Sequence, residues 1–137
     1  MLKEFLEYFG ARAGLIMTPA MCKEYDDYVL ANIAVGDGLT GDTPYYEHHA
    51  YTVIKRTAYT VTLQRDKAII DPNFVPEFSA NGVCRNSNRQ SYTYERDPDG
   101  EIIVAHWSKK NGGYHHKDFV AFNEGRHEYH DYTYWGA

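Results

Sequence analysis

The chain has 137 residues, of which 43% are hydrophobic and 24% charged, and its formal net charge is −5. This length fits a single domain, residues 1–137, that can build a core without disulfide bonds or structural metal ions. No apolar segment is long enough to span a membrane. The acidic balance argues against bulk nucleic-acid binding, because modules that grip a duplex are normally basic.

The two cysteines fit a reducing compartment, and the first residues do not resemble a secretory signal. Cys22 and Cys84 form no C-x-x-C pair, so no zinc ribbon is indicated. Residues Met1–Glu4 mix charges and precede no continuous apolar stretch, so no secretory signal is indicated. We therefore expect a soluble, cytoplasmic protein.

Two amphipathic helices are expected within residues 1–34. The first has apolar side chains at helical spacing and ends near Gly10 or Gly14. The second begins at Thr18-Pro19, an N-cap followed by a proline at the first helical position. We expect this helical leader to pack on the β region, although its apolar faces would also suit a partner or a dimer contact. The positions concerned are Leu2, Phe5, Leu6, Phe9 and Ala13 in the first helix, and Met21, Tyr25, Tyr28, Val29 and Asn32 in the second.

The chain from residue 35 onward carries β signals. A glycine-punctuated entry, Gly36-Asp37-Gly38, precedes two runs rich in β-branched and aromatic residues, Tyr51–Arg56 and Thr60–Arg65. In the second run, Val61 and Leu63 alternate with polar residues, which is typical of a half-buried strand. The sequence therefore predicts an α+β, mainly β fold: a small SH3-like or strongly bent antiparallel β-barrel or sheet with an N-terminal helical extension.

The second half of the chain predicts further strands around one long connection. Residues Asp66–Ser91 are expected to be irregular, and connections of this length are often functional. Ser91–Arg96 and Glu101–Trp107 are expected to form a hairpin around Asp97-Pro98-Asp99-Gly100, because proline and glycine occupy their preferred turn positions. Additional strands are expected at Phe119–Phe122 and Arg126–Trp135.

Several motifs of the β region form a recognisable set. They include D-P-N-F-x-P-E-F, at residues 71–78, and G-R-x-E-Y, at residues 125–129. As a set, the motifs resemble those of widespread small uncharacterised proteins from phages and mobile elements of Gram-positive bacteria. The resemblance implies a phage-like setting, with the helical leader as an addition, and it implies no activity. The matching stretches are Val35–Gly38, Ala50–Ile54, Gln64–Ala68, Asp71–Phe74, Pro76–Phe78, Tyr92–Glu95, Trp107–Lys110 and Gly125–Tyr129 with Asp131-Tyr132.

The strongest binding candidate is a polar loop at residues 81–90. Its arginines offer planar forks for phosphate or carboxylate, and its amides can read a base or ribose edge. Tyrosines that follow the loop can stack a base, and the 13 tyrosines of the chain make an aromatic face plausible. The alternative is a solvated loop held by its own side-chain-to-backbone bonds. The predicted ligand-binding residues are Arg85, Asn86, Asn88, Arg89, Gln90, Tyr92 and Tyr94, with Arg126 as an additional anchor.

The histidines are weaker candidates for a metal site. His48-His49 and His115-His116 are adjacent pairs, so in extended chain each pair offers one ligand per face. In the expected final strand, His130 would share a face with Glu128, and His127 would share one with Asp131. Because the sequence places no third ligand beside either set, we predict no metal site, and ordinary surface histidines remain the simpler interpretation.

The sequence favours binding over catalysis. No phosphate-binding glycine loop, G-x-S-x-G elbow or H-E-x-x-H helix occurs, and no histidine is placed to activate Cys84, so we expect neither a catalytic residue nor a cofactor. We expect a non-catalytic phage-type binding protein, acting in the host cytoplasm as a counter-defence inhibitor. It would sequester a small nucleotide-type host signal or dock on a host defence protein. A homo-oligomer stays open as an alternative to a monomer, since small barrels often assemble. Alternatives are a metal-dependent hydrolase or nuclease using His127, Glu128, His130 and Asp131, and a phage nucleic-acid accessory module.

Overall fold

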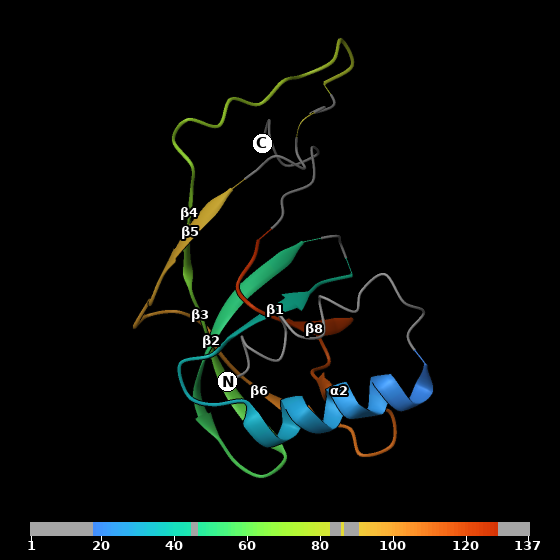
Figure 1. Ribbon diagram of the computed structural model, residues 1–137. Helices are drawn as coiled ribbons and strands as arrows, with labels where there is room; N and C mark the ends of the chain where they lie inside the picture. The colour runs from blue at the N-terminus through green and yellow to red at the C-terminus, as the bar shows by residue number, and fades with distance from the viewer. Residues whose placement is uncertain (1–17, 45–46, 83–85, 87–90, 129–137) are drawn as a thin grey trace.

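The computed structural model describes residues 18–44, 47–82, 86 and 91–128. In this part of the chain one helix is followed by a run of short strands, so the predicted α+β, mainly β class is confirmed (Figure 1). The first predicted helix lies outside the described residues. The elements are α2 (Pro19–Asn32), β1 (Gly38–Asp42), β2 (His48–Arg56), β3 (Thr60–Arg65), β4 (Lys67–Ile70), β5 (Tyr92–Glu95), β6 (Ile102–Trp107), β7 (Tyr114–His115) and β8 (Ala121–Glu124).

Six strands form one antiparallel sheet in the order β7-β6-β3-β2-β1-β8. A register shift between Val53 and Lys55 interrupts the β2–β3 ladder, and such bulges increase bending and twist. The two edge strands, β7 and β8, lie against each other. The sheet is therefore nearly closed into a small barrel, as the sequence predicts.

The core lies between the inner face of this sheet and α2. Alternate residues of the central strands are fully buried there, including Tyr51, Val53, Val61 and Leu63 at 0% exposure. Each such aliphatic side chain contributes about 1.5–3 kcal/mol when removed from water. Helix α2 adds Val29, so the helix is held to the barrel mainly through this contact face.

The ends of α2 are fixed by side chains. The Thr18 hydroxyl accepts from the Met21 backbone N–H at 3.1 Å, with Pro19 at the first helical position, as predicted. At the other end, the Arg56 guanidinium donates to the backbone carbonyls of Leu30, at 2.7 Å, and Ile33. These bonds satisfy carbonyls that a helix end leaves unpaired, and they tie α2 to β2.

The predicted hairpin between β5 and β6 is wrong, although its turn is present. Gly100 N–H donates to the Asp97 carbonyl at 3.0 Å. However, β6 pairs with β3, with Gln64 opposite Ile102, and β5 pairs with β4, with Lys67 opposite Glu95. The turn is therefore an insertion within one long antiparallel pairing of β3–β4 with β5–β6, rather than the end of a hairpin.

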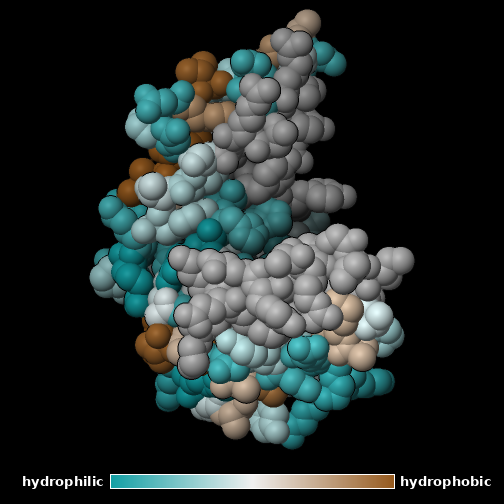
Figure 2. All heavy atoms as spheres, in the orientation of Figure 1, coloured by the Kyte–Doolittle hydropathy of each residue, from teal (hydrophilic) through white to brown (hydrophobic). Residues whose placement is uncertain are grey.

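The β4–β5 ladder forms an arm that extends away from the barrel and from α2 (Figure 1). The sequence predicted irregular chain throughout Asp66–Ser91, but its start is strand β4. Exposed apolar side chains occur on the arm and its loop, where Figure 2 shows brown areas; the large ones are Ile69, Val75 and Phe78.

The predicted final strand is not formed where the structure describes it. Residues 126–128 have no strand structure, and residues 129–135 of that prediction lie outside the described part. Within the part of the chain that the structure covers, no helix is both long and apolar enough to cross a membrane.

Candidate functional site

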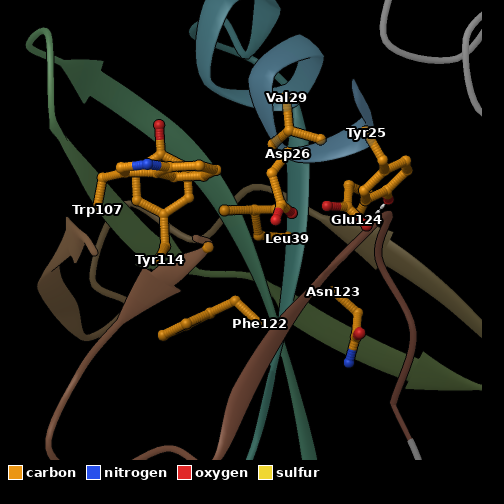
Figure 3. A pocket seen from close by; sticks show the side chains of 10 residues that line it. Tyr25, Asp26, Val29, Leu39, Trp107, Tyr114, Phe122, Asn123 and Glu124 are labelled. Atoms are coloured by element: carbon orange, nitrogen blue, oxygen red, sulfur yellow. Dashed lines mark hydrogen bonds between the residues drawn. The ribbon is translucent and has the colours of Figure 1, made fainter. Parts of the chain in front are cut away.

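The candidate site is a pocket of about 200 Å³ where α2 meets the open end of the barrel (Figure 3). Helix α2 forms one wall, and strands β1, β6, β7 and β8 contribute the others. We call it the inner pocket. Its lining residues are Tyr25, Asp26, Val29, Leu39, Trp107, Gly113, Tyr114, Phe122, Asn123 and Glu124.

Aromatic rings form one side of the inner pocket. The rings of Trp107 and Tyr114 meet edge to face, with centroids 4.9 Å apart and planes at 78°, an arrangement that aromatic quadrupoles favour. Tyr114 is 5% exposed. Its hydroxyl is buried and has no hydrogen-bond partner, which is true of no other buried side-chain polar atom among the described residues. Burial raises the pKa of Tyr114, against the opposing effect of Arg56, so this hydroxyl stays protonated and can donate.

Carboxylates form the opposite side. Figure 3 shows the Asp26 side chain reaching from α2 toward the middle of the group, with Glu124 beside Tyr25. The Tyr25 hydroxyl donates to Glu124 Oε2, which ties α2 to β8. Burial, followed by the charge of Asp27, raises the pKa of Asp26. An acidic side chain whose ionised form is destabilised in this way is typical of binding sites.

A second hollow of about 430 Å³ adjoins the inner pocket and shares Asp26 and Trp107 with it. We call it the outer groove. Three lysines line it: Lys23, Lys109 and Lys110. Its other lining residues are Pro19, Cys22, Asp27, Asn111 and Gly112.

The lysines of the outer groove are partly engaged but remain at the surface. Lys23 donates to Asp27 at 2.6 Å, and both side chains are more than half exposed, so this ion pair is weak. The Lys109 ammonium lies 4.2 Å from the centre of the Tyr59 ring, a cation–π contact that orients it at little cost. The groove therefore offers positive charge that an anionic group can recruit.

The two hollows together can hold a ligand with two chemically different ends. A flat, N–H-bearing group suits the aromatic rings and carboxylates of the inner pocket. An anion suits the lysines of the outer groove. Their joint volume falls in the range of small-molecule sites, about 300–1,000 Å³.

The structure places three of the predicted ligand-binding residues away from this site. Asn86 is buried; its amide donates to the Val75 carbonyl at 2.9 Å and accepts from the Glu77 N–H at 2.8 Å. It thereby shapes the loop beyond the arm. The side chains of Tyr92 and Tyr94, on β5, are half buried, and burial raises both their pKa values, that of Tyr94 to about 12. The predicted residues Arg85, Asn88, Arg89 and Gln90 lie outside the described part.

Arg126 is engaged in holding the barrel together. Its Nε donates to Asp66 Oδ2 at 2.9 Å, and its Nη2 donates to the Gly36 carbonyl at 2.7 Å and to Thr52 Oγ1 at 3.1 Å. The Asp66 side chain is only 2% exposed. These contacts supply the guanidinium with partners from three segments, so its observed role is structural.

The histidines gather differently from the predicted sets. His127 lies with His48 and Asp42, and one ligand atom from each falls within 4.8 Å of the others. Glu128 instead faces Arg65, at 3.5 Å, with its side chain 7% exposed. Desolvation of the ring, with the nearby His48, lowers the pKa of His127, and Asp42 opposes this shift. His130 and Asp131 lie outside the described residues.

Sequence reasoning missed the inner pocket because its residues are scattered. Tyr25 and Asp26 were assigned only to a helix, and Trp107 and Glu124 lie on β6 and β8, far along the chain. The available signal was the acidic residue beside an apolar helical face. Searches of protein-family models, of curated proteins and of solved structures found no match to this chain.

Proposed function

We propose that this protein is a non-catalytic binding protein that holds a small nucleotide-type ligand across the inner pocket and the outer groove. The observation that carries the proposal is the pair of adjoining hollows, one aromatic and acidic, the other lined by lysines, with Asp26 and Trp107 common to both. A nucleotide has the same division between a flat, N–H-bearing base and an anionic phosphate.

The inner pocket fits the base end. Trp107 presents a large ring against which a base can stack, a contact worth about 1–3 kcal/mol per base. The carboxylates of Asp26 and Glu124 can accept from base N–H groups, and charge-assisted bonds of this kind contribute about 1.5–3 kcal/mol. The same carboxylates repel phosphate, so they favour the base-inward orientation.

The outer groove fits the phosphate end. Lys109 and Lys110 stand on the turn after β6, beside Trp107, and Lys23 projects from the first turns of α2. These three lysines line the same hollow, and their flexible side chains can direct ammonium groups onto an anion. The binding site is thereby assembled from α2 and the β6–β7 connection.

The biological part of the proposal follows the resemblance to phage proteins. A phage protein that binds a nucleotide-type host signal without degrading it would act as a counter-defence inhibitor by sequestration, in the cytoplasm of the host cell. Sequestration needs affinity and not turnover, which agrees with the lack of a catalytic motif in the sequence.

Calorimetry with matched pairs of nucleosides and nucleotides tests the binding proposal. The probes are adenosine, guanosine and uridine, their 5′-monophosphates and the corresponding cyclic mono- and dinucleotides. We expect Trp107→Leu to weaken binding of both classes by about tenfold or more, because the stacking ring is lost. The Lys109→Ala/Lys110→Ala double variant should weaken nucleotide binding by about tenfold and leave nucleoside binding unchanged.

Lys55→Ala/Lys67→Ala is the matched control, since it also removes two positive charges and changes exposed lysines, on β2 and β4, that border neither hollow. It should bind every probe as the unmodified chain does. If nucleotide affinity falls equally in this control and in the Lys109/Lys110 variant, the loss reflects net charge and not a phosphate contact in the outer groove. Failure of every probe to bind would refute the nucleotide-type ligand.

A second candidate function is docking on a host defence protein through the arm. The observation that favours it is the exposure of Val75, at 71%, and Phe78, at 44%, on the loop beyond the arm. Exposed apolar side chains of this size are common at protein interfaces. Under this alternative, Val75→Ser/Phe78→Ser abolishes inhibition of defence in cells, whereas Trp107→Leu does not; sequestration predicts the reverse.

A further inference from the structure

We propose that Asp42, His48 and His127 form a binding site for a divalent transition-metal ion. The three residues come from different segments: Asp42 ends β1, His48 begins β2 and His127 follows β8. One ligand atom from each lies within 4.8 Å of the other two. Two imidazoles and one carboxylate are a ligand set that zinc and iron(II) sites use.

The sheet itself holds Asp42 and His48 together. They occupy directly opposite positions in the β1–β2 ladder, and His48 Nδ1 lies 2.5 Å from Asp42 Oδ1. A metal between them would take the place of this hydrogen bond, with the imidazole proton moving to Nε2. Ligand atoms on one tetrahedral zinc ion are about 3.4 Å apart, so small side-chain rotations are enough to accommodate the ion.

The surroundings of His127 select the nitrogen that can bind a metal. The Thr40 hydroxyl donates to the Gly125 carbonyl at 2.7 Å, which uses its single hydrogen. Thr40 Oγ1 therefore accepts from His127 Nδ1, 3.2 Å away, as it does from the His127 backbone N–H at 3.0 Å. The neutral ring then has its lone pair on Nε2, and a ligating histidine held in this way by a partner on its other nitrogen is typical of metal sites.

The carboxylate is oriented as well. Asn123, on β8, donates through Nδ2 to Asp42 Oδ2 at 2.6 Å. Thr40 and Asp42 lie two residues apart on β1 and therefore on the same face of the strand. Strand β1 thus carries one ligand and the residue that orients another, while β8 supplies Asn123.

The cluster also borders a hollow of about 300 Å³, so a bound ion would be reachable from solvent. Three protein ligands leave coordination positions for water or a small ligand. The metal site shares none of its three ligands with the proposed nucleotide site, although Asn123, which orients Asp42, also lines the inner pocket. Neither proposal depends on the other. The hollow is lined by Asp42, Thr43, Pro44, Glu47, His48 and Val120.

Titration of the tag-free full chain with ZnCl₂ by calorimetry tests the site, with CoCl₂ absorption spectra as a second readout. We expect one ion per chain and at least about tenfold weaker binding in His127→Ala and His48→Ala, whose side chains are at or near the surface. Asn123→Ala should weaken binding by about 10- to 100-fold, the usual effect of losing an orienting partner. Mg²⁺ should not compete, because nitrogen ligands disfavour it.

Two control variants keep the result specific. His115 borders a different hollow together with His106 and His116, so His115→Ala should bind Zn²⁺ as the unmodified chain does. His130→Ala should do the same, because the proposed ligand set does not contain it. Wild-type binding in His127→Ala, loss of binding in either control, or no Zn²⁺ binding by the full chain would each overturn the proposal.

Discussion

Arg126 donates through Nε to the buried carboxylate of Asp66 at 2.9 Å, across the junction of β3 and β4. The Thr52 hydroxyl donates to the other carboxylate oxygen at 2.6 Å, so both Asp66 oxygens are satisfied. A Cβ on Gly38 would lie 2.5 Å from Arg126 Cγ, which shows how closely the arginine stem packs on β1. Arg126 thereby joins the chain after β8 to the sheet.

Removing the Arg126 guanidinium should destabilise the fold substantially. Arg126→Met keeps the length of the side chain but leaves the Asp66 carboxylate buried without its charge partner. Loss of one partner from such a pair costs about 2–4 kcal/mol when the pair is partly shielded from water. Urea denaturation followed by circular dichroism measures this loss.

The double variant Arg126→Met/Asp66→Asn tests whether the cost arises from the unpaired charge. We expect it to be more stable than the sum of the two single losses indicates, because the second change removes the orphaned carboxylate. Strictly additive losses would mean that the two residues do not interact in solution.

Gly100 should tolerate a methyl group less well than Gly36, for different physical reasons. A Cβ on Gly100 would collide with the Arg65 carbonyl, because the 97–100 turn is folded back on β3. Gly36 has open space but a φ of +98°, so an added Cβ meets only backbone strain of about 1–2 kcal/mol. We expect Gly100→Ala to cost more than Gly36→Ala, with melting temperatures as the measurement. Equal costs would indicate that the turn moves freely.

The same turn shows how far the sequence could predict the fold. The alternation of Val61 and Leu63 predicts β3 correctly, and the chemistry of Asp97–Gly100 predicts a real turn. Strand pairing was not predictable from turn chemistry, because β6 pairs edge to edge with β3 and extends the buried face of the sheet through Ala105, instead of pairing with β5. Local preferences decide which residues form strands, and burial decides which strands become neighbours.

The candidate site was predicted less well for a related reason. Asp26 and Trp107 are 81 positions apart and meet only because α2 covers the end of the barrel where β6 finishes. The residue pattern within one segment does not show which distant residues that segment will contact. The polar loop was conspicuous because its residues are contiguous. Asn86, the one predicted ligand-binding residue of this loop that the structure describes, uses its amide to hold the loop.

Asp26→Asn should stabilise the protein at pH 7 and weaken ligand binding. The folded-state pKa of Asp26 is raised, so the folded chain still holds the proton at pH values where the unfolded chain has released it. Stability therefore declines as pH rises through that interval, and at pH 7 the ionised carboxylate carries the whole penalty. The asparagine removes the penalty but also the charge-assisted bond to the ligand, which should lower affinity by about tenfold or more.

Denaturation at several pH values, compared with the original chain, checks this sign. The stability advantage of Asp26→Asn should be present at pH 7 and shrink as pH falls below the ordinary range of an aspartic acid. Glu24→Gln, which changes an exposed carboxylate on the same helix, controls for net charge. An advantage that persists unchanged at low pH would contradict the role of burial.

Cys22 provides a chemical probe of the outer groove. It is exposed, it is a free thiol, and it lines the groove beside Lys23 and Asp26. In a Cys84→Ser background, a bound nucleotide should slow alkylation of Cys22 by iodoacetamide, because the phosphate end occupies the hollow next to the thiol. The corresponding nucleoside, held only in the inner pocket, should protect it less. Mass spectrometry of the alkylated fraction over time distinguishes the two, and equal protection by both would mean that the phosphate does not lie in the outer groove.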